Sequence, residues 1–126
     1  MRYMLLIYSQ RQPEMSDRNY MGHLSLMREA ADKGVFVAAE PLAPASKSTN
    51  VQVVDGKALV TDGPFTETKE QLAGYYILDC KDLEEAIEWA ARIPQACQGA
   101  EGRVEIRALP GIPKEFNTAA ESNGAA

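Results

Sequence analysis

The sequence is short of the residues that build metal and redox sites, because its 126 residues include two cysteines, one histidine and one tryptophan. Two cysteines, Cys80 and Cys97, supply neither the four ligands of a structural zinc site nor a disulfide framework. Neither has a histidine near it in the sequence, so a nucleophilic cysteine is not expected. Cys80, at the end of a predicted strand, is expected to be an inert buried thiol.

Glycine-rich phosphate loops are also absent. The sequence contains no GxGxxG fingerprint, no P-loop and no set of metal-ligand spacings. We therefore expect no cofactor and no bound metal.

The chain lacks an excess of basic residues: its net charge is -5 and its pI is near 4.9. Binding to phosphates needs clustered Lys and Arg, whereas the basic residues here are scattered singly among acids, so no nucleic-acid partner is expected. The apolar segment 1–8 is too short for a signal peptide, and no segment reaches the length of a membrane span. These absences predict a cytoplasmic protein with no membrane partner.

What is present predicts one domain of mixed structure. Strands are expected where β-favouring residues run or alternate, and helices where apolar residues recur every three or four positions. The predicted strands are 2–8, 35–40, 49–54, 58–61, 74–80 and 103–109, and the predicted helices are 16–34 and 82–93.

The first predicted helix has an apolar stripe formed by Tyr20, Leu24, Met27 and Ala31, with His23 on its flank. The second opens at Asp82 with capping-box spacing to Glu85. The residues predicted to be buried on it are Leu83, Ala86, Ile87, Ala90 and Ala91, and Trp89 at the edge of that stripe is expected in the core or an interface.

The Asp55-Gly56 dipeptide between two alternating runs is a strong hairpin signal, since both positions tolerate positive φ. The resulting order, β-α-β, hairpin, β-α-β, predicts an α+β ferredoxin-like sandwich: an antiparallel sheet with two helices on one face. The other face then needs a cover, and two sheets packed face to face in a homodimer would provide one.

Three segments carry a resemblance to a known family: "RYMLLIY", "VTDGPFTETKEQLAGYYILDCKDLEEAIEWAARIP" and "GRVEIRAL". They resemble the YCII-related, or DGPF-domain, proteins over about residues 2–109. The resemblance implies a dimeric α+β barrel with a domain at 1–109. The remaining segment, 110–126, is expected to be a tail that is disordered at its end. Some family members are encoded beside alternative sigma factors.

The resemblance also implies a catalytic pair, since some members carry a histidine in the first helix and an aspartate. His23 matches that histidine by its place in the helix, and Asp62 is the candidate partner. Alternatively, Asp62-Gly63-Pro64-Phe65 only builds a rigid bend in which Asp62 accepts backbone hydrogen bonds and Phe65 anchors the turn.

Further candidates for contact with a small-molecule ligand are Phe65, Lys69, Tyr75 and Tyr76. Each has a plainer interpretation: a turn anchor for Phe65, a solvated salt bridge for Lys69 and an aromatic core position for a tyrosine. Because Tyr75 and Tyr76 alternate across their strand, at most one of them faces a given cavity.

Two functions follow from these residues and stay open. One is cofactor-free acid–base chemistry, such as elimination or isomerisation of a small organic molecule, with His23 as acid or base and Asp62 as its partner. The other is a non-catalytic ligand-binding or accessory dimer that meets a regulatory partner. A purely structural dimer is a third possibility.

Overall fold

The computed structural model describes residues 1–10, 17–64 and 68–116. Its helices and strands follow one another as β1 (Arg2–Ser9), α1 (Asp17–Asp32), β2 (Phe36–Pro41), β3 (Thr49–Val54), β4 (Lys57–Asp62), β5 (Gln71–Asp79), α2 (Leu83–Ala90) and β6 (Gly102–Leu109). Short 3-10 turns, η1 to η4, lie at Ala45–Lys47, Pro94–Cys97, Gly99–Glu101 and Lys114–Phe116. The predicted elements are all present, with ends that differ by a few residues.

Four strands form one antiparallel sheet in the order β2-β5-β1-β6. Apart from the β3–β4 hairpin, the two halves each contribute a β-α-β unit, so this order is that of a ferredoxin-like fold. The predicted fold class is therefore confirmed. The hairpin is an insertion between β2 and β5 that pairs only with itself among the described residues.

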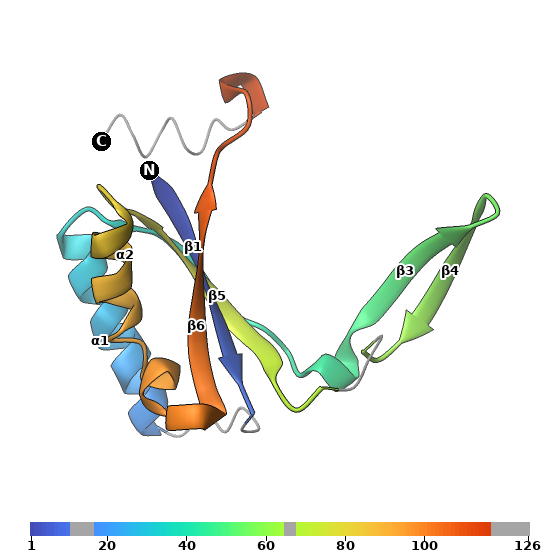
Figure 1. The fold of residues 1–126 in the computed structure, drawn as a ribbon, viewed down its shortest axis with the longest axis horizontal. Helices are drawn as coiled ribbons and strands as arrows, with labels where there is room; N and C mark the ends of the chain where they lie inside the picture. Colours follow the sequence, from blue (N-terminus) through green and yellow to red (C-terminus); the bar gives the residue numbers. More distant parts are fainter. Residues whose placement is uncertain (11–16, 65–67, 117–126) are drawn as a thin grey trace.

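Both helices lie on the same side of the sheet (Figure 1). We call this side the helix face; on β1 it carries the odd-numbered residues from Tyr3 to Ser9, all of them buried. The core between helices and sheet is formed by Tyr3, Leu5, Ile7, Leu26, Ala30, Val35, Tyr76, Leu78, Cys80, Ala86, Trp89, Ala90 and Ile93.

The predicted apolar stripe of the first helix is displaced from the observed one. The residues of α1 that enter the core are Leu26 and Ala30, with Met27 packed against them, whereas Tyr20 is 48% exposed. The observed stripe runs through positions 23, 26, 27 and 30, so His23 lies on the inner side of the helix. The bulky Tyr20 made the neighbouring stripe look equally apolar, and periodicity alone does not separate two such phases.

The second helix begins as predicted, because the side chain of Asp82 accepts a hydrogen bond from the backbone N–H of Glu85 at 2.9 Å. Its buried side is Ala86, Trp89 and Ala90, whereas Leu83 and Ile87, both predicted to be buried, are about half exposed. Ala91 is exposed too. Trp89, expected in the core or an interface, lies in the core.

The β3–β4 hairpin extends away from the sheet (Figure 1). Its turn uses positive φ at Asp55 (50°) and Gly56 (78°), the conformation that the Asp-Gly pair predicts. Its apolar side chains are open to solvent: Val51, Val53 and Val60 are 59–71% exposed. A two-stranded hairpin is marginally stable alone, and these valines have no cover among the described residues.

Two hydrogen bonds to the backbone of Gly63 hold the bend after β4. The N–H of Gly63 donates to the carbonyl of Ser48 at 2.7 Å, and the side-chain amide of Asn50 donates to the carbonyl of Gly63 at 2.5 Å. Gly63 has φ +87° rather than the extended conformation expected before a proline. Phe65, the predicted anchor, lies outside the described residues.

Candidate functional site

His23 and Tyr76 are joined by a hydrogen bond. Nδ1 of His23, on α1, lies 2.7 Å from the hydroxyl of Tyr76, on β5. The inner phase of α1 points the imidazole toward the sheet, and the alternation of β5 turns Tyr76 to the helix face. Two of the predicted site residues are thus brought together inside the molecule.

Burial shifts the pKa of both groups. It lowers the pKa of His23, because the charged imidazolium loses its solvation, and it raises the pKa of Tyr76 to about 12. Near neutral pH the pair is therefore a neutral imidazole beside a protonated phenol. The phenol can donate to Nδ1, or a protonated Nδ1 can donate to the phenol oxygen.

Gln95, in the 3-10 turn after α2, is the third polar group at this point. Its side chain raises the pKa of His23, which opposes the larger effect of burial. Its own Oε1 is buried without a hydrogen-bond donor among the described residues, so its contact with His23 is not a formed hydrogen bond. An N–H on the imidazole aimed at this oxygen would satisfy it.

Asp62 does not contact His23 within one chain. It is the last residue of β4 and is exposed, on the hairpin that extends away from the sheet, while α1 covers the opposite side of the sheet (Figure 1). The phenol of Tyr76 is the partner that His23 has instead. The predicted His23–Asp62 pair could form only between two chains, and the role of each residue stays a prediction.

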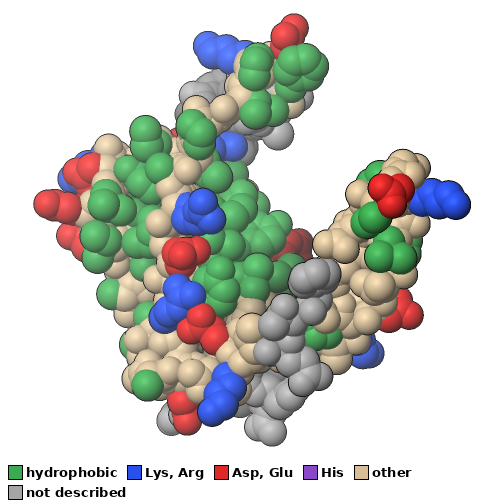
Figure 2. Space-filling view, turned by 45° about the vertical axis from the view of Figure 1, so that its right-hand side comes forward, with side chains coloured by type: hydrophobic (Ala, Val, Ile, Leu, Met, Phe, Trp, Pro, Cys, Tyr) green, Lys and Arg blue, Asp and Glu red, His purple; other side chains and the backbone are tan. Residues whose placement is uncertain are grey.

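The other side of the sheet carries the remaining candidates. We call it the open face; its apolar and aromatic residues on β1 and β5 include Met4, Leu6, Tyr8, Tyr75 and Ile77, all partly exposed. No helix or strand of the described chain covers it. In Figure 2 hydrophobic side chains gather beside the hairpin, bordered by a line of basic and acidic groups.

The charged border contains one well-formed ion pair. Arg103, on β6, donates through Nε and Nη2 to both carboxylate oxygens of Glu70, at 2.9 and 2.7 Å. Its guanidinium also lies 4.2 Å from the centre of the Tyr8 ring. The contact with Arg103 lowers the pKa of Glu70. Lys69, the predicted cation, is exposed beside Glu70.

Gly74 lets the edge strand approach the middle of the sheet. A Cβ at this position would lie 2.8 Å from the carbonyl oxygen of Glu40, so only glycine fits between β5 and β2. The register of β5 against β1 shifts next to it, between Ile7 and Tyr8. The close approach at Gly74 is therefore one between two strands.

No group of three or more His, Cys, Asp or Glu side chains is placed to hold a metal ion in the parts of the chain that the structure describes. Cys80 is buried, and its pKa is raised to about 11, chiefly by burial. Neither described helix is long and apolar enough to cross a membrane.

Sequence patterns did not identify three residues of these sites: Gln95, Arg103 and Tyr8. Gln95 follows Pro94, which begins the 3-10 turn after α2; a proline marks a turn but gives no direction for the next side chain. Arg103 and Tyr8 each fall on the open face by strand alternation, yet their contact depends on the pairing of β1 with β6.

The molecule is thus an α+β protein with a ferredoxin-like sheet, two helices on one face and an inserted hairpin. The YCII-related domain matches residues 1–110, and the chain belongs to that family. It is similar to an uncharacterized protein of Rhizobium meliloti (strain 1021), with 35% identity over 94 residues that cover 74% of this chain and 75% of that protein. Neither the description of the family nor the name of this relative states an activity.

Proposed function

We propose that this protein is a homodimer that binds a small, partly apolar organic molecule between the open faces of two copies. The observation that carries the proposal is the open face itself. On its central strands Met4, Leu6, Tyr75 and Ile77 are partly exposed, and the ion pair of Arg103 with Glu70 lies at its border. Apolar surface with a few fixed polar groups is typical of ligand sites.

The hairpin adds to the case for a second copy. Its exposed valines pair across the strands as Val51 with Val60 and Val53 with Ala58, so they share one apolar side. An exposed apolar stripe on an otherwise unsupported hairpin is costly in water unless another surface covers it. In a dimer the hairpin of one copy would reach past its own sheet and contact the other copy.

The dimer is tested by the molar mass in solution, measured by light scattering. Wild type should be a dimer, and Leu6→Lys should be a monomer, because the charge would be buried between two open faces. Glu84→Lys, on the exposed side of α2, is the control and should stay dimeric. A wild-type monomer at high concentration, or a dimeric Leu6→Lys, would contradict the proposal.

Ligand binding is tested with the apolar fluorescent dye 1-anilinonaphthalene-8-sulfonate. The native dimer should enhance its fluorescence saturably, and Tyr75→Ala should weaken that binding. Enhancement by the Leu6→Lys monomer alone would mean that the two faces pack directly against each other and leave no cavity, which would refute the binding role.

A second candidate function, acid–base catalysis, is favoured by the 2.7 Å contact of His23 with Tyr76. When Nδ1–H donates to the phenol oxygen, Nε2 of the neutral imidazole keeps its lone pair and can accept a proton from a substrate carbon or hydroxyl, while the phenol orients the ring. His23 is half-buried between α1 and the sheet, whereas the open face is accessible, so this candidate stands behind the binding role.

Because His23 is the only histidine, its imidazole signal in an NMR titration needs no assignment. Tyr76→Phe should shift the titration midpoint, and Asp62→Asn should leave it unchanged if the partner is Tyr76 alone. A shift with Asp62→Asn that disappears in the Leu6→Lys monomer would instead establish a pair formed across the dimer. No shift in either variant would remove the acid–base candidate.

A further inference from the structure

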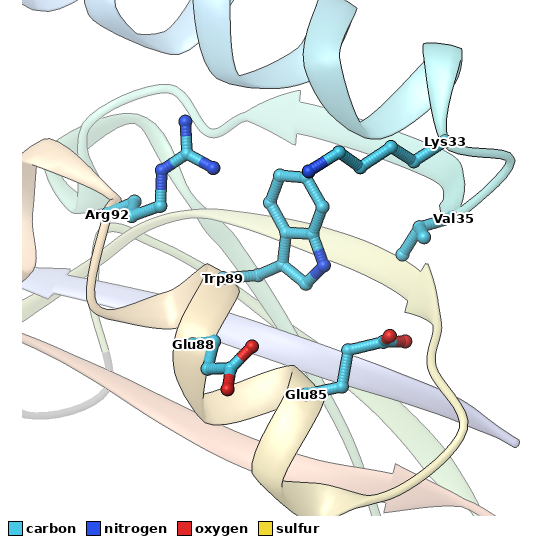
Figure 3. Close-up of a pocket in the computed structure, with 6 residues that line it drawn as sticks. All are labelled: Lys33, Val35, Glu85, Glu88, Trp89 and Arg92. Atoms are coloured by element: carbon cyan, nitrogen blue, oxygen red, sulfur yellow. The ribbon is translucent and has the colours of Figure 1, made fainter.

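A hollow of about 300 Å³ lies between the end of α1 and α2, on the helix side of the sheet (Figure 3). It is lined by Lys33, Val35, Glu85, Glu88, Trp89 and Arg92. A volume of this size accommodates a small ligand, whereas the hollow beside Ser9, about 10 Å³, barely holds a water molecule. None of the residues that line it belongs to the open face or to the His23–Tyr76 pair.

The floor of the hollow is apolar. Trp89 is 6% exposed and Val35 8% exposed, so both belong to the core and also line the hollow. Nε1 of Trp89 has no acceptor among the described residues and is not one of their fully buried unpaired atoms. The indole therefore offers one free hydrogen-bond donor to a bound molecule.

One wall is basic. Nζ of Lys33 lies 5.5 Å from the centre of the indole ring, and Cζ of Arg92 lies 5.2 Å from it. Both cations also form ion pairs with Glu29. Each keeps further N–H donors that one shared carboxylate cannot satisfy.

The opposite wall is acidic (Figure 3). Glu85 and Glu88 stand on α2 three residues apart, so their side chains share one side of the helix. Glu85 accepts a hydrogen bond from the backbone N–H of Lys81, and Glu88 has no partner among the side chains that the structure describes. Neither carboxylate has a cation paired with it among those side chains.

We propose that this hollow binds a small zwitterion with an apolar body, of the α-amino-acid type. Its ammonium group would lie against Glu85 and Glu88, and its carboxylate would accept from Lys33 and the indole N–H. The apolar body would rest on Trp89 and Val35. A simple amine would be repelled by the basic wall and a simple carboxylate by the acidic wall, whereas a zwitterion matches both.

Trp89 is the only tryptophan, so its fluorescence reports on this hollow directly. The native protein is titrated with L-leucine and, separately, with isoamylamine and isocaproate, which carry the same apolar body and only one charge. Leucine should change the fluorescence saturably, with a dissociation constant at least about tenfold lower than that of either analogue. No saturable change with leucine, or equal affinity for an analogue, would overturn the proposal.

A matched pair of variants locates the binding. Glu88→Gln should weaken leucine binding about tenfold, because a charge-assisted contact to the ammonium is lost. Glu84→Gln removes a carboxylate from the same helix outside the hollow and should bind leucine as the wild type does. Equal binding by the Glu88→Gln variant and the wild type would show that the ligand does not occupy this hollow.

Discussion

The two faces of the sheet differ in how they are covered, and neighbouring residues of β1 make the contrast plain. Leu5 points to the helix face and has no exposed surface, while Leu6, the next residue, points to the open face and is partly exposed. The helix face is closed by α1 and α2 within one chain. Within the described part of one chain, therefore, helices cover only one of the two faces of the sheet.

The largest expected effect separates these two leucines. Leu5→Ala should lower the free energy of unfolding by about 2–5 kcal/mol, since it leaves a cavity in a closed core. Leu6→Ala should cost far less at protein concentrations too low for dimers. Urea denaturation of both variants at low and high protein concentration measures these losses. Equal losses of unfolding free energy for the two variants at high dilution would contradict the expected difference between the faces.

A smaller effect should separate the two tyrosines of β5. Tyr76→Phe removes the hydroxyl bonded to His23 and should cost about 1 kcal/mol of stability. Tyr75→Phe, on the open face, removes the same group, which has no hydrogen-bond partner among the described residues, and should cost less. Thermal unfolding of both variants gives the difference; a larger loss with Tyr75→Phe would contradict the assignment of faces.

The helix face should also respond to pH through His23. Burial holds its pKa below the ordinary value of 6.5, so the unfolded chain takes up a proton more readily than the folded one. The stability from this group is fully present above pH 6.5 and is lost as pH falls through the folded pKa. In His23→Gln this part of the pH dependence of unfolding should vanish, and an unchanged profile would refute it.

The smallest effect is expected on the open face, at the charged border. Arg103→Gln removes the ion pair with Glu70 and the contact with the Tyr8 ring, both near solvent. Its effect on stability should be slight and should shrink as salt is added, because exposed ion pairs are screened. Denaturation at low and high ionic strength measures this, and a loss as large as that of Leu5→Ala would contradict it.

Much of the fold could be predicted from the sequence, because each signal there is local. The Asp55-Gly56 turn, the Asp82 cap and the alternation of β6 each specify a conformation through neighbouring residues. The ferredoxin-like order then follows from the sequence of elements.

The candidate site was harder to predict, because its contacts join residues that are distant in the sequence. His23 and Tyr76 are 53 positions apart, and their contact depends on the phase of α1, which the sequence pattern assigned to the wrong stripe. The prediction of Asp62 as a partner came from family resemblance and could not include the position of the hairpin. The Trp89 hollow depends on the packing of two helix ends, for which the sequence holds no local signal.

The most direct test of the central claim follows the methionine methyl groups by NMR with a soluble paramagnetic agent. Met4 lies on the open face, Met27 packs against the core, and Met21 is 56% exposed. At dimer-forming concentrations we expect Met4 to be protected like Met27 while Met21 is attenuated, and we expect Leu6→Lys to expose Met4. Attenuation of Met4 to the level of Met21 in the concentrated wild-type protein would show that the open face is not covered by a second copy.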